Sequence, residues 1–179
     1  MKDLLQVIGF QPKENAKDIF IKKYLDGYVI EIDFQKEIIN YGDKIICESK
    51  TTQNFSQSEN FVVLECVNRL LEKGYKPENI TLEKTWAAGH GTSGRLDICV
   101  TREDGSEYLL IECKTHGKEF EKEFTRMKQN GGQLFTYFKF SNKADVVMLY
   151  SSELKGKEIV YRNEIVKIED DYRTGDVKD

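Results

Sequence analysis

The chain has 179 residues and a net charge of −4 at pH 7, with 39% hydrophobic and 32% charged residues. This length suffices for one domain with a hydrophobic core, and the composition excludes a wholly disordered chain. The net negative charge excludes the global basic field of a dedicated nucleic-acid-binding protein. No apolar run approaches the ~18 residues that span a bilayer. The four cysteines form no CxxC pair, so we expect a soluble, cytoplasmic protein without a membrane partner.

We expect residues 1–54 to form an N-terminal helix and a β-rich arm that packs on the rest of the chain. Apolar residues at helical spacing predict a helix over residues 19–25. The pattern then changes to period two, which predicts short strands at residues 29–33, 37–40 and 44–47. We expect the last two strands to pair as a hairpin.

A helix is expected between Ser56 and Gly74, at the start of a core domain that spans residues 55–168. The segment SQSE, which ends at Glu59, has the form of a capping box, and Gly74 is a typical C-terminal stop. The helix carries two candidate acids. Glu59 has a role in the cap, whereas Glu65 lies in mid-helix and points toward the apolar side. We therefore prefer Glu65 as the helical acid of a site, with Glu59 as the alternative.

A strand over residues 80–86 leads into a glycine-rich loop, residues 88–95. Gly89 and Gly94 have the spacing of a phosphate-binding loop, but the required Lys-Ser/Thr pair is missing and a strand follows instead of a helix. We therefore expect no nucleotide cofactor. The loop is interpreted as a flexible lip of the site that can approach a DNA backbone.

The stretch from Gly94 to Lys114 predicts a β-hairpin, because Asp104-Gly105 separates two apolar runs. A turn centred between these two residues places Asp97 directly opposite Glu112, with Lys114 on the same face. Facing Cβ atoms are about 4.5–5.5 Å apart, so the two carboxylates require a cation or a proton between them. A Mg²⁺ ion suits such oxygen ligands, and Lys114 is placed to polarise a water on that ion.

Two alternatives remain for this hairpin. Acidic residues are common on the solvent face of an exposed hairpin, although both faces here are partly apolar, which is typical of buried central strands. A one-residue bulge would place Asp97 and Glu112 on opposite faces and remove the site.

Two helices are expected downstream of the hairpin. A charged helix begins after Gly117 and is interrupted at Gly131-Gly132. A second helix, over residues 133–140, places Gln133 and Tyr137 one turn apart on the same face.

The C-terminal part is expected to return to strands. An apolar strand covers residues 144–150, and a terminal hairpin is predicted from residues 158–161 and 165–168. Residues 169–179 are polar and are interpreted as a tail or as a linker to a larger protein.

Asp97, followed after fourteen residues by Glu112-Cys113-Lys114, resembles the core of the PD-(D/E)XK nuclease superfamily. The chain is more narrowly similar to the nuclease domain at the N terminus of type I restriction enzyme R subunits and of single-chain restriction-modification proteins. The preceding helix with Glu65 and the downstream element from Gln133 to Tyr137 carry this narrower resemblance, whereas Leu96 stands where the motif name has proline. The resemblance implies an α/β fold of the mixed α+β kind, with a central mixed sheet flanked by helices.

The resemblance implies a metal site in a nuclease. It implies a Mg²⁺-dependent endodeoxyribonuclease, in which Mn²⁺ can substitute for Mg²⁺. Asp97, Glu112 and the Cys113 backbone carbonyl would hold the ion, and Glu65 would bind a second ion or a metal-bound water.

The resemblance also implies roles for three further side chains and for partners. Lys114 would orient or deprotonate the attacking water, while Gln133 and Tyr137 would position the substrate or Lys114. The substrate would be double-stranded DNA, cleaved within a restriction-modification system. Helicase, translocase or methyltransferase domains would be fused to the chain or associated with it.

Two other functions compete with this one. The chain could be a catalytically inactive nuclease-like module for DNA binding or docking, although the intact set of Asp97, Glu112 and Lys114 argues against lost catalysis. It could also be an α/β interaction domain in which the motif is accidental. A lack of metal binding would distinguish the interaction domain from the nuclease. Metal binding without cleavage would favour the inactive module.

Overall fold

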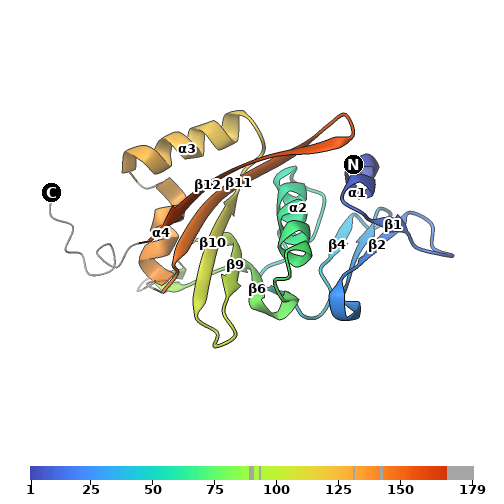
Figure 1. Cartoon of the computed structure of the whole chain (residues 1–179), viewed down its shortest axis with the longest axis horizontal. Helices are drawn as coiled ribbons and strands as arrows, with labels where there is room; N and C mark the ends of the chain where they lie inside the picture. Colours follow the sequence, from blue (N-terminus) through green and yellow to red (C-terminus); the bar gives the residue numbers. More distant parts are fainter. Residues whose placement is uncertain (89–90, 93, 131, 142, 169–179) are drawn as a thin grey trace.

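The computed structural model describes residues 1–88, 91–92, 94–130, 132–141 and 143–168. Its main feature is a six-stranded sheet in the order β12-β11-β10-β9-β6-β5 (Figure 1). The sheet is mixed, because the pairs β10–β11 and β5–β6 are parallel and the other pairs are antiparallel. Its strands are β5 (Ile46–Cys47), β6 (Ile80–Lys84), β9 (Leu96–Thr101), β10 (Glu107–Cys113), β11 (Val146–Lys155) and β12 (Glu158–Lys167).

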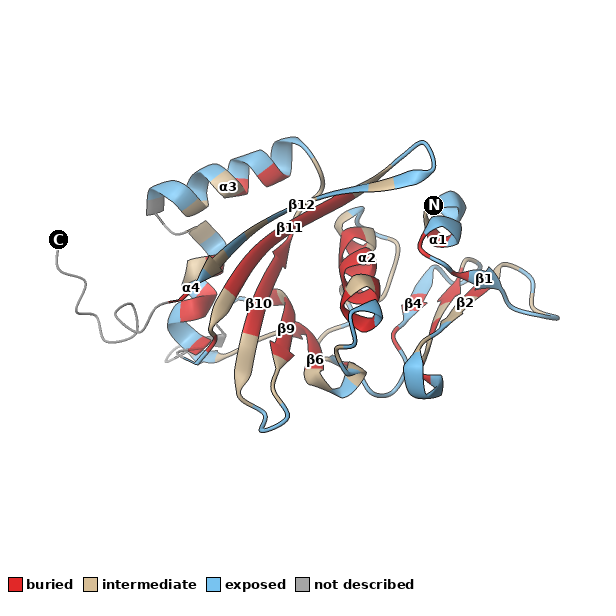
Figure 2. Cartoon of the chain, in the orientation of Figure 1, coloured by how far each residue is buried: buried red, intermediate tan, exposed pale blue. Residues whose placement is uncertain are grey.

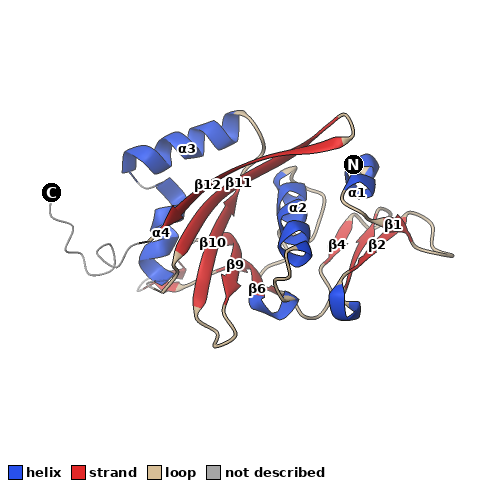
Figure 3. Cartoon of the chain, in the orientation of Figure 1, coloured by secondary structure: helices blue, strands red, loops and turns tan. Residues whose placement is uncertain are grey.

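Helices cover both faces of this sheet (Figure 3). Helix α2 (Glu59–Glu72) packs on one face. Helix α4 (Gly132–Ser141) packs on the other face, beside α3 (Lys118–Asn130). This arrangement confirms the predicted α/β fold, with a central mixed sheet flanked by helices.

The central strands are buried on both faces because their side chains alternate between two hydrophobic clusters (Figure 2). Ile98 and Ile111 belong to the cluster beneath α2, whereas Cys99 and Leu110 belong to the cluster beneath α4. Such strands occupy the middle of a sheet. The exposed-hairpin alternative is therefore excluded.

Residues before α2 form a smaller layer beside that helix (Figure 1). The segment α1 (Lys2–Val7) precedes a four-stranded sheet, and the 3-10 turn Leu25–Gly27 connects its second and third strands. Lys22 fixes this arm to α2, because its ammonium donates a hydrogen bond to Asn68 Oδ1 at 2.6 Å. The strands of the arm are β1 (Gln11–Pro12), β2 (Ile19–Lys23), β3 (Val29–Asp33) and β4 (Ile38–Asn40).

Two predictions for the arm are wrong. The helix expected over residues 19–25 is replaced by strand β2, because β-branched and aromatic residues in the run IFIKK favour a pleated surface. The strands expected at residues 37–40 and 44–47 do not pair with each other. Strand β5 pairs with β6 instead and extends the main sheet.

The predicted terminal hairpin is also wrong. Strand β12 runs without a break through Arg162-Asn163 and pairs along its whole length with β11. The turn that joins them lies at Gly156, which adopts a φ of +62°. Strands β11 and β12 therefore have 10 residues each, where the pattern indicated one strand over residues 144–150 and two shorter ones over residues 158–161 and 165–168.

Short elements surround the loop expected at residues 88–95. The 3-10 turn Pro77–Asn79 precedes β6, and β7 (Ala87–Ala88) pairs with β8 (Gly91–Thr92). Parts of this loop, and the predicted tail at residues 169–179, lie outside the described residues. No helix in the described part of the chain is long and apolar enough to cross a membrane.

Candidate active site

The turn of the β9–β10 hairpin is longer than predicted. Its loop has three residues, Glu103 to Gly105, and the Arg102 N–H closes it by donating a hydrogen bond to the Ser106 carbonyl at 2.8 Å. Gly105 has a φ of +80°, which suits the left-handed position of such a loop. The predicted two-residue turn is therefore wrong, and the pairing next to the loop is one residue out of step with the prediction.

A β-bulge at Tyr108, between the loop and the site, shifts the pairing by one residue. Two residues of β10 there oppose one residue of β9, so every later pair is shifted by one. The pairs are Thr101–Glu107 before the bulge, then Val100–Leu109, Cys99–Leu110 and Ile98–Ile111. Continued by one residue, this register places Asp97 opposite Glu112, as predicted. The bulge lies on the turn side of the pair and does not separate the two carboxylates.

Asp97, Glu112 and Lys114 meet where β9 begins and β10 ends. The Cys113 N–H donates a hydrogen bond of 2.7 Å to Asp97 Oδ2, so the Asp97 side chain occupies the place of the next ladder bond. The Lys114 ammonium donates to Glu112 Oε1 at 2.7 Å and to the Cys113 carbonyl at 3.0 Å. Glu59 Oε2 lies 3.6 Å from the same ammonium. The structure therefore brings four of the candidate side chains together.

Burial and the neighbouring charges shift the pKa values of Asp97, Glu112 and Lys114. Burial raises the pKa of Asp97 to about 7, with help from Glu59 and against the opposing effect of Lys114. Burial and the neighbouring Asp97 raise the pKa of Glu112 well above its ordinary value. Burial alone would lower the pKa of Lys114, but the surrounding carboxylates raise it above its ordinary value. The site therefore has more negative charge than Lys114 neutralises.

One oxygen of the site fits a metal ligand. Glu112 is 1% exposed, and its Oε2 has no hydrogen-bond partner among the described residues. A buried, unpaired carboxylate oxygen is costly unless a cation or a proton lies against it. No group of three or more His, Cys, Asp or Glu side chains in the described part of the chain is assembled to hold a metal. The donor set is therefore two carboxylates and a backbone carbonyl, which suits Mg²⁺ because that ion retains several waters.

Glu65 is not part of this group, and Glu59 lies beside Lys114 in its place. Glu65 Oε1 accepts a hydrogen bond from Arg69 at 2.6 Å, and its Oε2 accepts one from the Tyr150 hydroxyl. Tyr150 belongs to the cluster beneath α2, whereas Glu112 alternates with Ile111 and faces the α4 side. Glu65 thus holds α2 to β11 through both of its carboxylate oxygens.

The predicted capping box does not form. Helix α2 begins at Glu59 with Ser58 as its N-cap, and the Ser58 side chain makes no capping hydrogen bond. The role that appeared to occupy Glu59 is therefore absent. Its carboxylate instead extends from the first turn of α2 toward Lys114.

Gln133 and Tyr137 reach the site indirectly. Gln133 Nε2 donates a hydrogen bond to the Tyr137 hydroxyl, which donates in turn to the Arg95 carbonyl; both bonds are 2.7 Å. The indole of Trp86 stacks on the Tyr137 ring with a centroid distance of 5.9 Å. These contacts support the segment that leads into Asp97, and neither side chain contacts Lys114.

Glu83 is a further carboxylate beside the site that the sequence did not predict. Its neighbours Leu82 and Lys84 pair with Ile98 and Leu96, so Glu83 lies opposite Asp97 on the other side of β9. It is buried and has a φ of +56°, which is uncommon outside glycine. The only signal in the sequence is a carboxylate at the end of an apolar strand, which gives no indication of this position.

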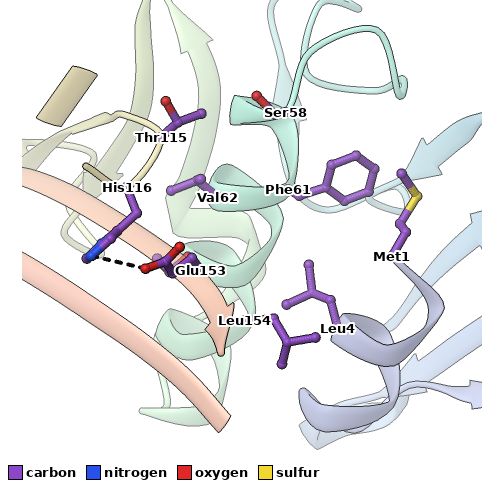
Figure 4. Close-up of a pocket in the computed structure, with 10 residues that line it drawn as sticks. Met1, Leu4, Ser58, Phe61, Val62, Thr115, His116, Glu153 and Leu154 are labelled. Atoms are coloured by element: carbon purple, nitrogen blue, oxygen red, sulfur yellow. Dashed lines mark ion pairs between the residues drawn. The ribbon is translucent and has the colours of Figure 1, made fainter. Parts of the chain in front are cut away.

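A cavity of 430 Å³ borders the site where the arm, α2 and β11 meet (Figure 4). Ser58 and Thr115, the residues next to Glu59 and Lys114, line one end of it. His116 Nε2 lies 3.3 Å from Glu153 Oε1 at its wall. Much of the lining is apolar, so this cavity is distinct in character from the carboxylate group.

Comparison with known proteins identifies the family of the chain. A search of curated proteins finds no match. The family model described as type I restriction enzyme R protein N terminus matches residues 58–165. The match extends from the N-cap of α2 into β12 and includes every residue of the group around Lys114. The chain therefore belongs to the family of type I restriction enzyme R protein N termini.

Proposed function

We propose that this chain is a metal-dependent endonuclease domain of a restriction-modification system that hydrolyses phosphodiester bonds in double-stranded DNA. The observation that carries the proposal is Glu112 Oε2, which is buried and unpaired opposite Asp97 and beside Lys114. The family match supports a role in a restriction system.

Asp97, Glu112 and the Cys113 carbonyl would hold Mg²⁺, or Mn²⁺ in its place. When bound, the ion would supply an activated water and offset the charge that develops on the phosphorus. The Cys113 N–H keeps Asp97 Oδ2 in a fixed direction, which leaves Oδ1 for the ion. Lys114 would release part of its contact with Glu112 as the carboxylate turns to the metal.

Lys114 acts as a donor in this proposal. In the metal-free protein the carboxylates raise the pKa of Lys114, so its side chain is an ammonium at neutral pH. It would orient the attacking water, whose oxygen would bond to phosphorus while its proton passes to solvent. The bond to the leaving oxygen would break, and that oxygen would take a proton from solvent. Glu59 holds the ammonium from the helix side.

The partners follow from the family and from the small size of the domain. Helicase, translocase or methyltransferase domains, fused or associated, would bring DNA to the site and supply sequence specificity. Activity on DNA is therefore best measured after metal binding has been established.

Titration calorimetry with Mn²⁺ tests the proposal on the wild type, Asp97→Ala and Glu112→Ala. Glu103→Ala is the matched control, because Glu103 is an exposed carboxylate paired with Lys76 on the hairpin loop. We expect binding in the wild type and the control, and its loss in both site variants. A wild type that binds no Mn²⁺ at millimolar concentration would contradict the proposal and favour a docking module.

Cleavage of supercoiled plasmid with Mg²⁺ or Mn²⁺ is the second test. The wild type, alone or with its motor subunit, should nick or linearise the plasmid, and Asp97→Ala should not. Metal binding without cleavage in either setting would identify an inactive nuclease-like module.

A further inference from the structure

We propose that Arg95 is a contact for the DNA backbone, held beside Asp97 by Glu83, Ser49 and Thr51. This inference rests on the proposed function, because it names a residue that binds the substrate of the same site. Asp97 follows Arg95 by two residues, and Arg95 directly precedes β9, so the two residues lie close together in the chain.

The guanidinium of Arg95 is anchored by three groups from two other segments. Its Nε lies 3.1 Å from Glu83 Oε2 on β6. Its Nη1 donates hydrogen bonds to Ser49 Oγ at 3.0 Å and to Thr51 Oγ1 at 2.8 Å, both in the segment that follows β5. The backbone of the same residue is held from α4, where the Tyr137 hydroxyl binds its carbonyl. The side chain is thus fixed before any substrate arrives.

This anchoring leaves one end of the guanidinium available. Arginine has five N–H donors, and the two hydrogen bonds above use those on Nη1, while Nε is paired with Glu83. The structure gives Nη2 no partner among the described residues. The Arg95 side chain is 48% exposed, whereas that of Glu83 is 6% exposed. A buried carboxylate therefore holds an arginine whose far end faces solvent.

The charge of the site explains the need for such a cation. A phosphodiester that approaches the site meets the carboxyl groups of Asp97, Glu112 and Glu59. Lys114 already contacts the last two of these groups. A guanidinium with two parallel donors binds a phosphate more specifically than an ammonium does. Glu83 adopts a left-handed backbone conformation to reach Arg95, and such outliers cluster at functional sites.

A charge-neutral double variant tests the inference. Glu83→Gln with Arg95→Gln removes one negative and one positive charge, so the net charge is unchanged and no buried charge is left unpaired. The matched control is Glu121→Gln with Arg162→Gln, an ion pair between α3 and β12. Its side chains are 59% and 37% exposed. Thermal unfolding of both double variants confirms that they fold.

The readout is the binding of a fluorescein-labelled DNA duplex by anisotropy, with Ca²⁺ in place of Mg²⁺ so that no turnover occurs. Each phosphate contact contributes about 0.9 to the slope of log K against log salt concentration. We expect the Glu83/Arg95 double variant to lose about 0.9 from this slope and to bind about tenfold more weakly at low salt. The control should keep the wild-type slope.

Three outcomes would overturn the inference. They are a wild-type slope in the Glu83/Arg95 double variant, an equal loss of slope in the control, and a wild type that binds no duplex. The single variant Glu83→Gln should bind at least as tightly as the wild type, because Arg95 then carries an unneutralised charge. A wild type that binds the duplex but never cleaves it refutes the proposed function. In that case the salt slope of the Glu83/Arg95 double variant still decides whether Arg95 contacts the DNA backbone.

Discussion

The Tyr137 hydroxyl donates a hydrogen bond of 2.7 Å to the backbone carbonyl of Arg95. This contact joins α4 to the segment that enters β9, two residues before Asp97. The Tyr137 ring is buried against Trp86, so the hydroxyl has a fixed position. Tyr137 therefore controls where β9 begins, and through that the position of Asp97.

Replacement of this hydroxyl should weaken metal binding. Tyr137→Phe should lower the Mn²⁺ affinity about tenfold, as loss of an outer-shell partner typically does. Tyr24→Phe is the control, because its hydroxyl donates a hydrogen bond of 2.9 Å to Asn68 far from the site. Both variants should lose about 1 kcal/mol of unfolding free energy, measured with urea. Equal Mn²⁺ affinities in Tyr137→Phe and the wild type would show that the contact is purely structural.

The two helical acids should separate activity from stability. Glu59→Gln should reduce DNA cleavage by about 10–100-fold, because Lys114 loses a carboxylate that positions it. Its unfolding free energy should stay within about 0.5 kcal/mol of the wild type.

Glu65→Gln should give the reverse pattern. This change leaves Arg69 without its carboxylate partner and should cost about 2–3 kcal/mol of unfolding free energy. Mn²⁺ affinity should not change, because the Glu65 side chain lies on the face of α2 that packs on the sheet and contacts Arg69 and Tyr150 instead of Lys114. Loss of metal binding in Glu65→Gln, measured by calorimetry on folded protein, would restore Glu65 as the helical acid.

Asp97 should make the metal-free protein less stable as the pH rises. Its pKa is about 7 in the folded protein and about 3.9 in the unfolded chain, so the folded state binds more protons between these values. Stability is therefore lost from about pH 4 to pH 7, and the full cost applies above pH 7. Asp97→Asn keeps an oxygen for the Cys113 N–H. It should exceed the wild type in stability at about pH 8 by on the order of 1–3 kcal/mol, and by less at about pH 5.

Asp33 provides a control of opposite sign. Hydrogen bonds from the backbone N–H groups of Lys36 and Gln35 lower the pKa of its carboxyl. The stability that Asp33 contributes is present above its unfolded pKa and is lost as the pH falls through the lower folded value. Asp33→Asn should therefore lose stability at about pH 8, where Asp97→Asn gains it. Urea unfolding in EDTA measures both, and a destabilised Asp97→Asn at that pH would contradict the assigned pKa.

Metal affinity should also depend on pH. The ion binds ionised carboxylates, so below the Asp97 pKa of about 7 a proton must leave on binding. The Mn²⁺ dissociation constant should rise by about tenfold for each pH unit below 7. Calorimetry in two buffers of different ionisation enthalpy measures the proton released. Equal affinities on the two sides of neutral pH would show that Asp97 is already ionised in the free protein.

Local patterns predicted the parts of the site that lie on one hairpin. The alternation through β9 and β10 predicted that Asp97 and Glu112 face each other, but the predicted turn was wrong. The pairing holds because the bulge at Tyr108, which the pattern did not indicate, compensates for the three-residue loop. The helical pattern also predicted that Glu65 is buried, which is correct. What it could not show is the group that Glu65 meets, because Tyr150 lies 85 residues away in the chain.

The missed residues depend on contacts between elements. Glu83 reaches Arg95 only because β6 pairs with β9 and because one residue adopts a left-handed conformation. The error at residues 19–25 has a local cause, since a short apolar run fits either period. Glu59 was set aside for a capping box that the helix does not form.

The bulge at Tyr108 separates the hairpin loop from the catalytic end of the same hairpin. Residues on the loop side of the bulge follow the three-residue turn, whereas those beyond it follow the pairing that aligns Asp97 with Glu112. A change in loop length can therefore be absorbed at the bulge, by gain or loss of the extra residue, while the two carboxylates stay in register. The loop is thus a place where relatives can acquire insertions, and where a tag or a fused domain can be placed, without a change in the pairing of Asp97 and Glu112.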